Sequence, residues 1–142
     1  MSLAVVAALG LLQIRALAHA KGKSVRITCL SNLKRLAMAW QMYAQENQGE
    51  LIGAANWQVG LKTIPNWAGG SWLTLNNRRD PNNWDHESFT KKSALWPYAN
   101  DTELWRCPAD PATAIDRSGT LVPRIRSYSM NSWVGGPGWS PS

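Results

Sequence analysis

The sequence predicts an α+β fold in which one long N-terminal α-helix packs on a small antiparallel β-sheet with long loops. Three observations lead to it: a helical period of apolar residues, a group of helix-ending residues at 47–49, and many turn formers after residue 49. The chain therefore divides into residues 1–47, expected to be helical, and residues 48–142, expected to form a loop-rich globular α+β domain.

The helical prediction depends mainly on residues 29–49. Apolar residues recur there at steps of three and four, which is the period of an amphipathic helix. Residues 24–46 contain neither Gly nor Pro, and the sequence Asn-Gln-Gly at 47–49 favours the turn conformations that end a helix. We expect an amphipathic segment at 24–46 that ends near residue 47. The side chains expected to pack on the domain are Leu33, Leu36, Ala37, Trp40 and Ala44.

Nothing between residues 11 and 21 breaks a helix, so one helix can run from about residue 3 to residue 46. At about 1.5 Å per residue it would be roughly 65 Å long, more than a domain of this size needs for its own core. Something else must cover the remainder. The side chains expected to form an assembly surface there are Leu3, Val5, Val6, Leu9, Leu11, Leu12 and Ile14.

Residues 3–12 (LAVVAALGLL) are wholly apolar, and we interpret them as an anchor. Gln13 and Arg15 interrupt this run well short of the roughly 20 residues that cross a bilayer, so it does not span a membrane alone. Three interpretations are open. The run is the core of a secretory signal peptide with a small-x-small cleavage site at 18–20, a buried helix of a soluble protein, or a membrane or filament anchor whose first residues are missing.

Turn formers beyond residue 49 leave only short segments between them. The candidate strands are Ser71–Leu75, Leu104–Cys107 and Arg124–Met130. Phe89–Ala99 is predicted to be a short helix.

Three widely spaced segments carry a family resemblance: residues 16–51, residues 95–110 (LWPYANDTELWRCPAD) and residues 126–133 (RSYSMNSW). In them the chain resembles pilin-like proteins with a prepilin-type N-terminal cleavage and methylation segment, related to type IV pilins and to the pseudopilins of type II secretion. The resemblance implies a pilin-like fold and a structural subunit of a pilus or pseudopilus. It also implies helix-mediated assembly with other pilin-like subunits, in a homo- or hetero-filament. The expected location is the cell envelope, either anchored in the inner membrane with the domain in the periplasm or in an extracellular filament.

The chain departs from the family pattern at both ends. Members begin with a short basic leader and a Gly-Phe-Thr-Leu-x-Glu type signature, and many continue to a C-terminal Asp-Gly-His element. This sequence begins at Met1 inside the apolar run and ends at Ser142 after GGPGWSPS. We therefore expect a chain truncated at both ends relative to the family, with the processing site carried by no residue here.

Cys29 and Cys107 are the only two cysteines and lie 78 positions apart. This spacing fits no Cys-x-x-Cys redox or zinc site. In an oxidising envelope compartment the two are expected to form a disulfide that ties the helix to the domain, worth roughly 4 kcal/mol in the chain-entropy model. The alternative is two unpaired buried thiols.

The chain contains nine tryptophans and one phenylalanine. Core packing explains most of the tryptophans, because a loop-rich domain must build its core from its available apolar side chains. The alternative is a secreted Trp-rich carbohydrate-binding or adhesion module. Its indoles would stack on sugar rings, and polar contacts would come from Asn56, Asn66, Asn76 and Asn77.

The formal net charge of +6 is concentrated in residues 1–45, which contain six basic residues and no acidic one. The basic residues are Arg15, Lys21, Lys23, Arg26, Lys34 and Arg35. Such a segment after an apolar run suits an anionic membrane surface or a polyanion, and the alternative is a solvated helix face. No nucleic-acid motif occurs, so no specific nucleic-acid partner is predicted, and a small-molecule ligand is left open. The mean hydropathy of −0.30 excludes a polytopic membrane protein.

No catalytic motif is found, so the chain is not expected to be an enzyme and no cofactor or metal is predicted. The one oxygen-rich cluster lacks the glycine and the spacing of an EF-hand loop, and we interpret it as a solvated loop. It consists of Asp80, Asn82, Asp85 and Glu87. Asp110 and Asp116 are interpreted as turn and capping residues rather than as an acid pair.

Overall fold

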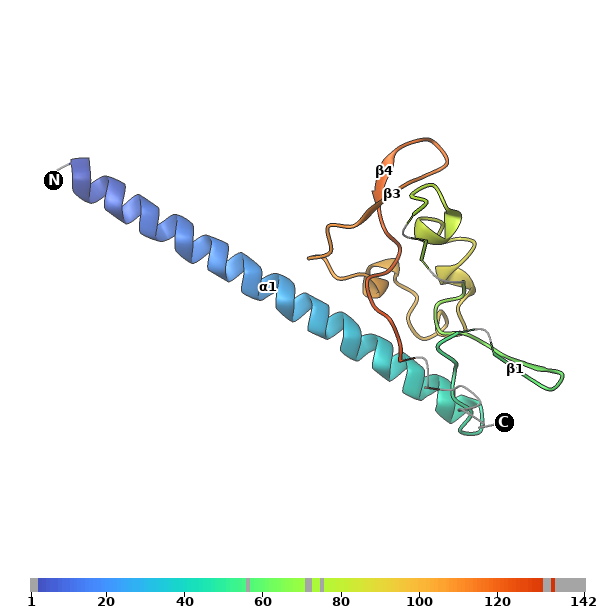
Figure 1. Cartoon of the computed structure of the whole chain (residues 1–142). Helices are drawn as coiled ribbons and strands as arrows, with labels where there is room; N and C mark the ends of the chain where they lie inside the picture. Colours follow the sequence, from blue (N-terminus) through green and yellow to red (C-terminus); the bar gives the residue numbers. More distant parts are fainter. Residues whose placement is uncertain (1–2, 56, 71–72, 75, 132–133, 135–142) are drawn as a thin grey trace, which may run out of the picture.

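A computed structural model gives the fold of the chain. It describes residues 3–55, 57–70, 73–74, 76–131 and 134. For residues 3–19, 57–59 and 62 it describes the backbone alone, and for the others it also describes the side chains. One long helix, α1, runs the length of the molecule, and a small domain lies beside its C-terminal half (Figure 1). The N-terminal half of α1 projects away from the domain. An α+β architecture with a long N-terminal helix is therefore confirmed.

Helix α1 spans Leu3–Glu46, 44 residues without an internal break. Its end follows from the backbone at 47–49, where Gln48 (φ 58°) and Gly49 (φ 85°) both adopt the left-handed conformation. The amide of Gly49 then donates to the carbonyl of Ala44 at 2.8 Å, which satisfies one of the last helical acceptors. The predicted end near residue 47 is confirmed.

Among the described residues, two antiparallel hairpins supply the strands. In the first, β1 (Trp57–Val59) pairs with β2 (Lys62–Ile64), and Gly60 occupies the turn with a φ of 60°. In the second, β3 (Thr113–Ile115) pairs with β4 (Leu121–Pro123). Each sheet has two strands. The β1–β2 hairpin extends outward from the domain (Figure 1).

Within the described part of the chain, three short 3₁₀ helices lie between the hairpins: η1 (Pro81–Asn83), η2 (Thr90–Lys92) and η3 (Thr102–Trp105). The predicted strand Leu104–Cys107 is wrong, because η3 occupies its first two residues and the other two lie in no strand. The carboxylate of Asp101 accepts from the amide of Glu103 at 3.0 Å and so starts a helical turn there. Among the described elements α1 makes its main contact with η3. The expectation that the helix packs on a sheet is therefore wrong.

The other predicted elements also differ from the structure. Arg124–Met130 is not a strand. Two of its amides donate to the last residues of 3₁₀ helices: that of Ile125 to the carbonyl of Asn83 in η1 and that of Ser127 to the carbonyl of Trp105 in η3, both at 3.0 Å. The predicted helix Phe89–Ala99 reduces to η2 followed by turns. Of Ser71–Leu75, residues 73 and 74 are described and lie in no strand, and the rest lies outside the described residues.

The core lies between α1, η3 and the loops that follow α1. Trp67 and Trp105 are buried in it and stack on each other, with ring centroids 5.5 Å apart and planes 19° apart. The predicted core role of tryptophan is confirmed for these two. The core residues are Leu36, Ala39, Ile52, Trp67, Ala68, Leu95, Ala99, Leu104 and Trp105.

The remaining tryptophans divide into two groups. Trp40, Trp84 and Trp96 are half-buried. The side chains of the others lie outside the described ones, so the sugar-stacking alternative stays untested for them. They are Trp57, Trp72, Trp133 and Trp139.

Candidate functional site

The contact between α1 and the domain begins with a disulfide. Cys29 on the helix bonds to Cys107, just after η3, with Cα atoms 4.9 Å apart, a normal separation for a disulfide. The bridge closes a separation of 78 residues. The predicted pairing is confirmed, and it joins the helix to the domain as expected.

One turn further along α1, Asn32 binds the end of η3. Its amide Nδ2 donates to the carbonyl oxygens of Glu103 and Arg106, both at 3.0 Å. Asn32 is 8% exposed, so water does not readily replace these two bonds. The hydroxyl of Tyr128 donates to the carbonyl of Cys29 at 3.3 Å, which adds the segment after Arg124 to the same contact.

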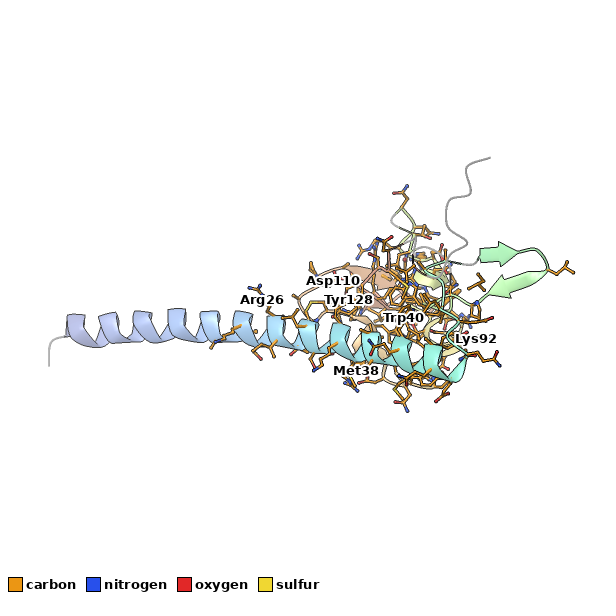
Figure 2. All side chains as sticks on the ribbon, turned by 90° about the horizontal axis from the view of Figure 1, so that it is seen from below. Arg26, Met38, Trp40, Lys92, Asp110 and Tyr128 are labelled. Atoms are coloured by element: carbon orange, nitrogen blue, oxygen red, sulfur yellow. A yellow bond between two sulfur atoms is a disulfide. The ribbon has the colours of Figure 1, made fainter. Side chains whose placement is uncertain are left out.

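Below Asn32 the contact becomes apolar. Leu36 and Ala39 are 7% and 1% exposed and belong to the core, and Trp40 and Tyr43 pack against it. We call this stripe the docking face. It consists of Cys29, Asn32, Leu36, Ala39, Trp40 and Tyr43, and Figure 2 shows Trp40 and Tyr128 within the cluster of side chains around this part of α1.

The docking face continues to the last turn of α1. The hydroxyl of Tyr98 donates to Oε2 of Glu46 at 2.6 Å, and the ring of Tyr98 meets that of Tyr43 edge to face, with centroids 6.4 Å apart. The indole N–H of Trp40 reaches the carbonyl of Ile52 at 3.5 Å. Side-chain contacts thus hold the helix to the domain over five turns, from residue 29 to residue 46.

The predicted packing residues fall partly on this face. Leu36 and Trp40 belong to it, and Ala44 is half-buried. Leu33, 43% exposed, and Ala37, also exposed, lie at its edge instead. The docking face is therefore rotated from the predicted stripe toward Asn32 and Ala39.

Sequence reasoning missed Asn32, Ala39 and Tyr43. A count of large apolar residues gives no weight to a buried amide or a methyl group. Their regular spacing with Cys29 and Leu36, in steps of three and four, is the signal that could have found them. The cysteine identifies the correct face, because a disulfide must point toward its partner.

Several large apolar side chains on α1 remain exposed. Ile27, Leu30, Met38 and Met42 are 45–59% exposed. They point away from the docking face, since a residue advances about 100° around a helix. The helix therefore presents apolar groups on both sides along residues 27–42.

An apolar groove lies beside the docking face, with a volume of about 340 Å³. Its walls come from α1, from the loops carrying Trp67 and Leu95, and from residues 128–130 and 134. Leu33 and Ala37 line it, which explains why apolar residues occur at these exposed helix positions.

The expected assembly residues on the N-terminal half of α1 have side chains outside the described ones. They are Leu3, Val5, Val6, Leu9, Leu11, Leu12 and Ile14. The backbone there is helical, so they share one continuous helix with the docking face. No helix within the described part of the chain is both long enough and apolar enough to cross a membrane.

The basic residues of α1 whose side chains are described are exposed. They are Lys21, Lys23, Arg26, Lys34 and Arg35. Nη1 of Arg35 lies 3.8 Å from Oδ2 of Asp101. Both side chains are largely solvated, so this ion pair contributes little to stability. The segment thus presents exposed positive charges to the surroundings.

The oxygen-rich cluster uses its carboxylates for local structure. Asp80 accepts from the amide of Asn82 at 2.9 Å and from the hydroxyl of Thr74 at 2.6 Å, and these bonds lower its pKa. Asp85 accepts from the amide and hydroxyl of Ser88, and Glu87 pairs with Lys91. Within the described residues no group of three or more His, Cys, Asp or Glu side chains could hold a metal ion.

Asp110 and Asp116 hold turns, as predicted. Asp116 accepts from the amides of Ser118 and Thr120, both at 2.9 Å, and so shapes the β3–β4 turn. Asp110 accepts from the amide of Ala112 at 2.9 Å and from the hydroxyl of Ser127 at 2.5 Å.

Two of the asparagines considered for sugar contacts, Asn66 and Asn77, form hydrogen bonds within the domain. Asn66 is 7% exposed, donates to the carbonyl of Gly70 and accepts from the amide of Ala68, both at 2.9 Å. Asn77 accepts from the amide of Arg79. Asn76 is exposed, and Asn56 lies outside the described residues.

Comparisons of the chain with protein-family models, with curated proteins and with solved structures found no match.

Proposed function

We propose that the protein is a structural subunit of a pilus or pseudopilus of the cell envelope, which assembles through α1 with other pilin-like subunits. The observation that carries the proposal is the division of α1. Contacts with the domain hold residues 29–46, whereas the N-terminal half continues away from the domain as the same helix (Figure 1).

A helix of 44 residues is about 65 Å long, and an isolated apolar stretch of it needs a partner to remove it from water. The predicted anchor at residues 3–12 is the most apolar part of the chain. Packing of this segment against the helices of neighbouring subunits, or burial in the inner membrane, supplies that partner. The exposed apolar side chains at 27, 30, 38 and 42 offer a further surface for helix packing.

The disulfide and Asn32 support the same role. An assembled subunit transmits force between its helix and its domain, and a covalent bond with two buried hydrogen bonds keeps the two together. In this proposal the protein works by assembly and not by catalysis. Its domain lies outside the inner membrane.

Photo-crosslinking in the native host tests the proposal. A benzophenone amino acid is placed at Leu30 or Met38 on the exposed side of α1, with a third variant at Leu61, the fully exposed tip of the β1–β2 hairpin, as control. We expect a ladder of multimers in the envelope fraction from the two helix positions, stronger than from Leu61. Equal weak crosslinking from all three would contradict the proposal.

The rival function is a secreted Trp-rich carbohydrate-binding or adhesion module with a cleaved signal. A mature secreted protein that begins near Lys21 would favour it. Intact α1 recovered in the envelope fraction would favour the subunit. N-terminal sequencing of the endogenous protein separates the two.

A further inference from the structure

A basic part of α1 precedes the docking face. We call it the basic segment; it covers residues 15–26 and contains Arg15, Lys21, Lys23 and Arg26. The side chains of the last three are exposed, and among the described residues none of the three forms an ion pair. Figure 2 shows Arg26 projecting from α1 on the N-terminal side of the domain. The charges of these side chains are therefore open to an external partner.

The acidic groups of the molecule lie beyond this segment. The first acidic residue of the chain is Glu46, in the last turn of α1. From the domain, Asp101 comes close to the helix at Arg35, and Glu103 comes close to it at Asn32. Position 32 is about 9 Å along the helix axis from the end of the basic segment. Physiological salt screens charges over a similar distance, so these carboxylates leave most of the positive charge uncompensated.

The basic side chains lie on opposite sides of the helix. Successive residues of an α-helix are about 100° apart, which places Lys21 about 160° from Lys23 and about 140° from Arg26. A helix that lies flat on a membrane keeps its cations on one face and its apolar residues on the other. The basic segment does not have this division. Its arrangement fits a helix that enters a membrane end on, because such a helix meets lipid headgroups on every side.

An apolar segment adjoins the basic segment on the same helix. Residues 3–12 are wholly apolar, and α1 continues from them into residues 15–26 without a break. Side chains of an α-helix lean toward its N-terminus, so the long lysine and arginine side chains lean toward this apolar end. Such side chains keep their charged groups at a membrane surface while their stems lie along apolar surface. A basic cluster next to an apolar helix is typical of segments that bind anionic lipids.

We propose that residues 15–26 bind the phosphate headgroups of anionic lipids, with α1 entering the bilayer end on and residues 3–12 in its hydrocarbon. The inference rests on the proposed function, in which the inner membrane covers residues 3–12, and it adds the class of lipid around the helix. Each basic residue near an anionic surface strengthens binding by about fivefold. The four basic residues together therefore select anionic over neutral lipids.

Vesicle flotation of the full, oxidised chain provides the test. The protein is diluted from detergent onto vesicles of phosphatidylcholine alone, or onto vesicles that also contain phosphatidylglycerol. We expect binding to the anionic vesicles to be at least about tenfold tighter, and this preference should shrink in high salt. Equal binding to both kinds of vesicle would overturn the proposal.

A triple variant locates the effect on the helix. The changes Lys21→Gln, Lys23→Gln and Arg26→Gln together should weaken binding to anionic vesicles by about tenfold or more and leave binding to neutral vesicles unchanged. All three positions are exposed on α1, so the fold should persist, and circular dichroism checks that it does.

A second triple variant is the matched control. The changes Arg79→Gln, Lys92→Gln and Arg117→Gln remove the same charge from exposed positions of the domain, and they should leave binding to both kinds of vesicle unchanged. An equal loss in the two triple variants would mean that net charge, and not the basic segment, attracts the lipid. That result would overturn the proposal.

Single variants test the end-on geometry. Lys21→Gln and Lys23→Gln lie on opposite sides of α1, and each should weaken binding to anionic vesicles by roughly two- to fivefold. A loss at one position alone would show that the helix lies flat, and the end-on geometry would be wrong.

A DNA duplex is the competing polyanion. Binding of DNA as tight as that of the anionic vesicles, with the same loss in the helix variant, would overturn the choice of lipid. Vesicle binding needs no other subunit, so its failure is distinguishable from failure of assembly. If the helix positions still crosslink into multimers in the host while the vesicles show no anionic preference, only the lipid proposal is wrong.

Discussion

The two halves of α1 differ in what covers their apolar surface. From residue 29 to residue 46 a disulfide, buried hydrogen bonds and core packing hold the helix to the domain. The N-terminal half projects from the domain with a more apolar sequence (Figure 1). The difference indicates that contacts with the domain stabilise the first region. In the proposed function, neighbouring subunits or the inner membrane cover the second.

Loss of the disulfide should have the largest effect on the docked half. Reduction, or Cys29→Ser combined with Cys107→Ser, is expected to remove up to about 4 kcal/mol of stability. For a chain of this size the melting temperature should fall by roughly 10 °C. Calorimetry with and without dithiothreitol measures the change, and the double variant should not respond to dithiothreitol. An unchanged melting temperature would show that the bridge does not hold the helix.

Truncation of Leu36 should have the next largest effect. Leu36→Ala creates a cavity in the core and is expected to cost about 3 kcal/mol. Leu33→Ala is the matched control, since Leu33 is 43% exposed at the edge of the same helix, and it should cost less than about 1 kcal/mol. Denaturant unfolding compares the two. Equal costs would mean that the docking face is misplaced.

Asn32 gives a smaller, polar test of the same contact. Asn32→Ala removes the side-chain donor from the carbonyls of Glu103 and Arg106, and we expect a loss of about 2 kcal/mol. Ser31→Ala, one residue away and exposed, should change stability little. A loss confined to Asn32→Ala, with the disulfide intact by mass spectrometry, would confirm the role of the amide.

The smallest expected effect is a loss of stability in acid, through the carboxylate of Asp80 in the domain. The hydroxyl of Thr74 lowers the pKa of Asp80, and a carboxyl with a lowered folded pKa contributes stability above its unfolded pKa of about 4. That contribution disappears as the pH falls through the folded pKa. Thr74→Val should therefore be less stable than the unmodified chain at pH 7 and approach it below pH 4. A difference that does not vary with pH would contradict this assignment.

The helix was predictable because its signals are local. A helical period without Gly or Pro, followed by Asn-Gln-Gly, defines both the length of α1 and its end. The strands were not, because each has three residues and owes its pairing to a turn. Gly60 and the Asp116 turn were the available signals. The sequence Leu-Trp-Arg-Cys at 104–107 indicated a strand, but the cap at Asp101 starts η3 there instead.

The docking face was only half predictable for a different reason. The cysteine pairing, Leu36 and Trp40 followed from the sequence. The role of Asn32 did not, since its partners are backbone carbonyls 71 and 74 residues away.

Hydrogen exchange along α1 tests the central claim most directly, in the isolated protein and in the assembled envelope fraction. In the isolated protein, amides of residues 32–46 should exchange slowly and those of residues 13–24 much faster, because contacts with the domain protect only the first group. In the envelope fraction, residues 13–24 should become protected as neighbouring subunits cover them. Equal protection of both regions in the isolated protein, or unchanged exchange at 13–24 in the envelope, would contradict the account.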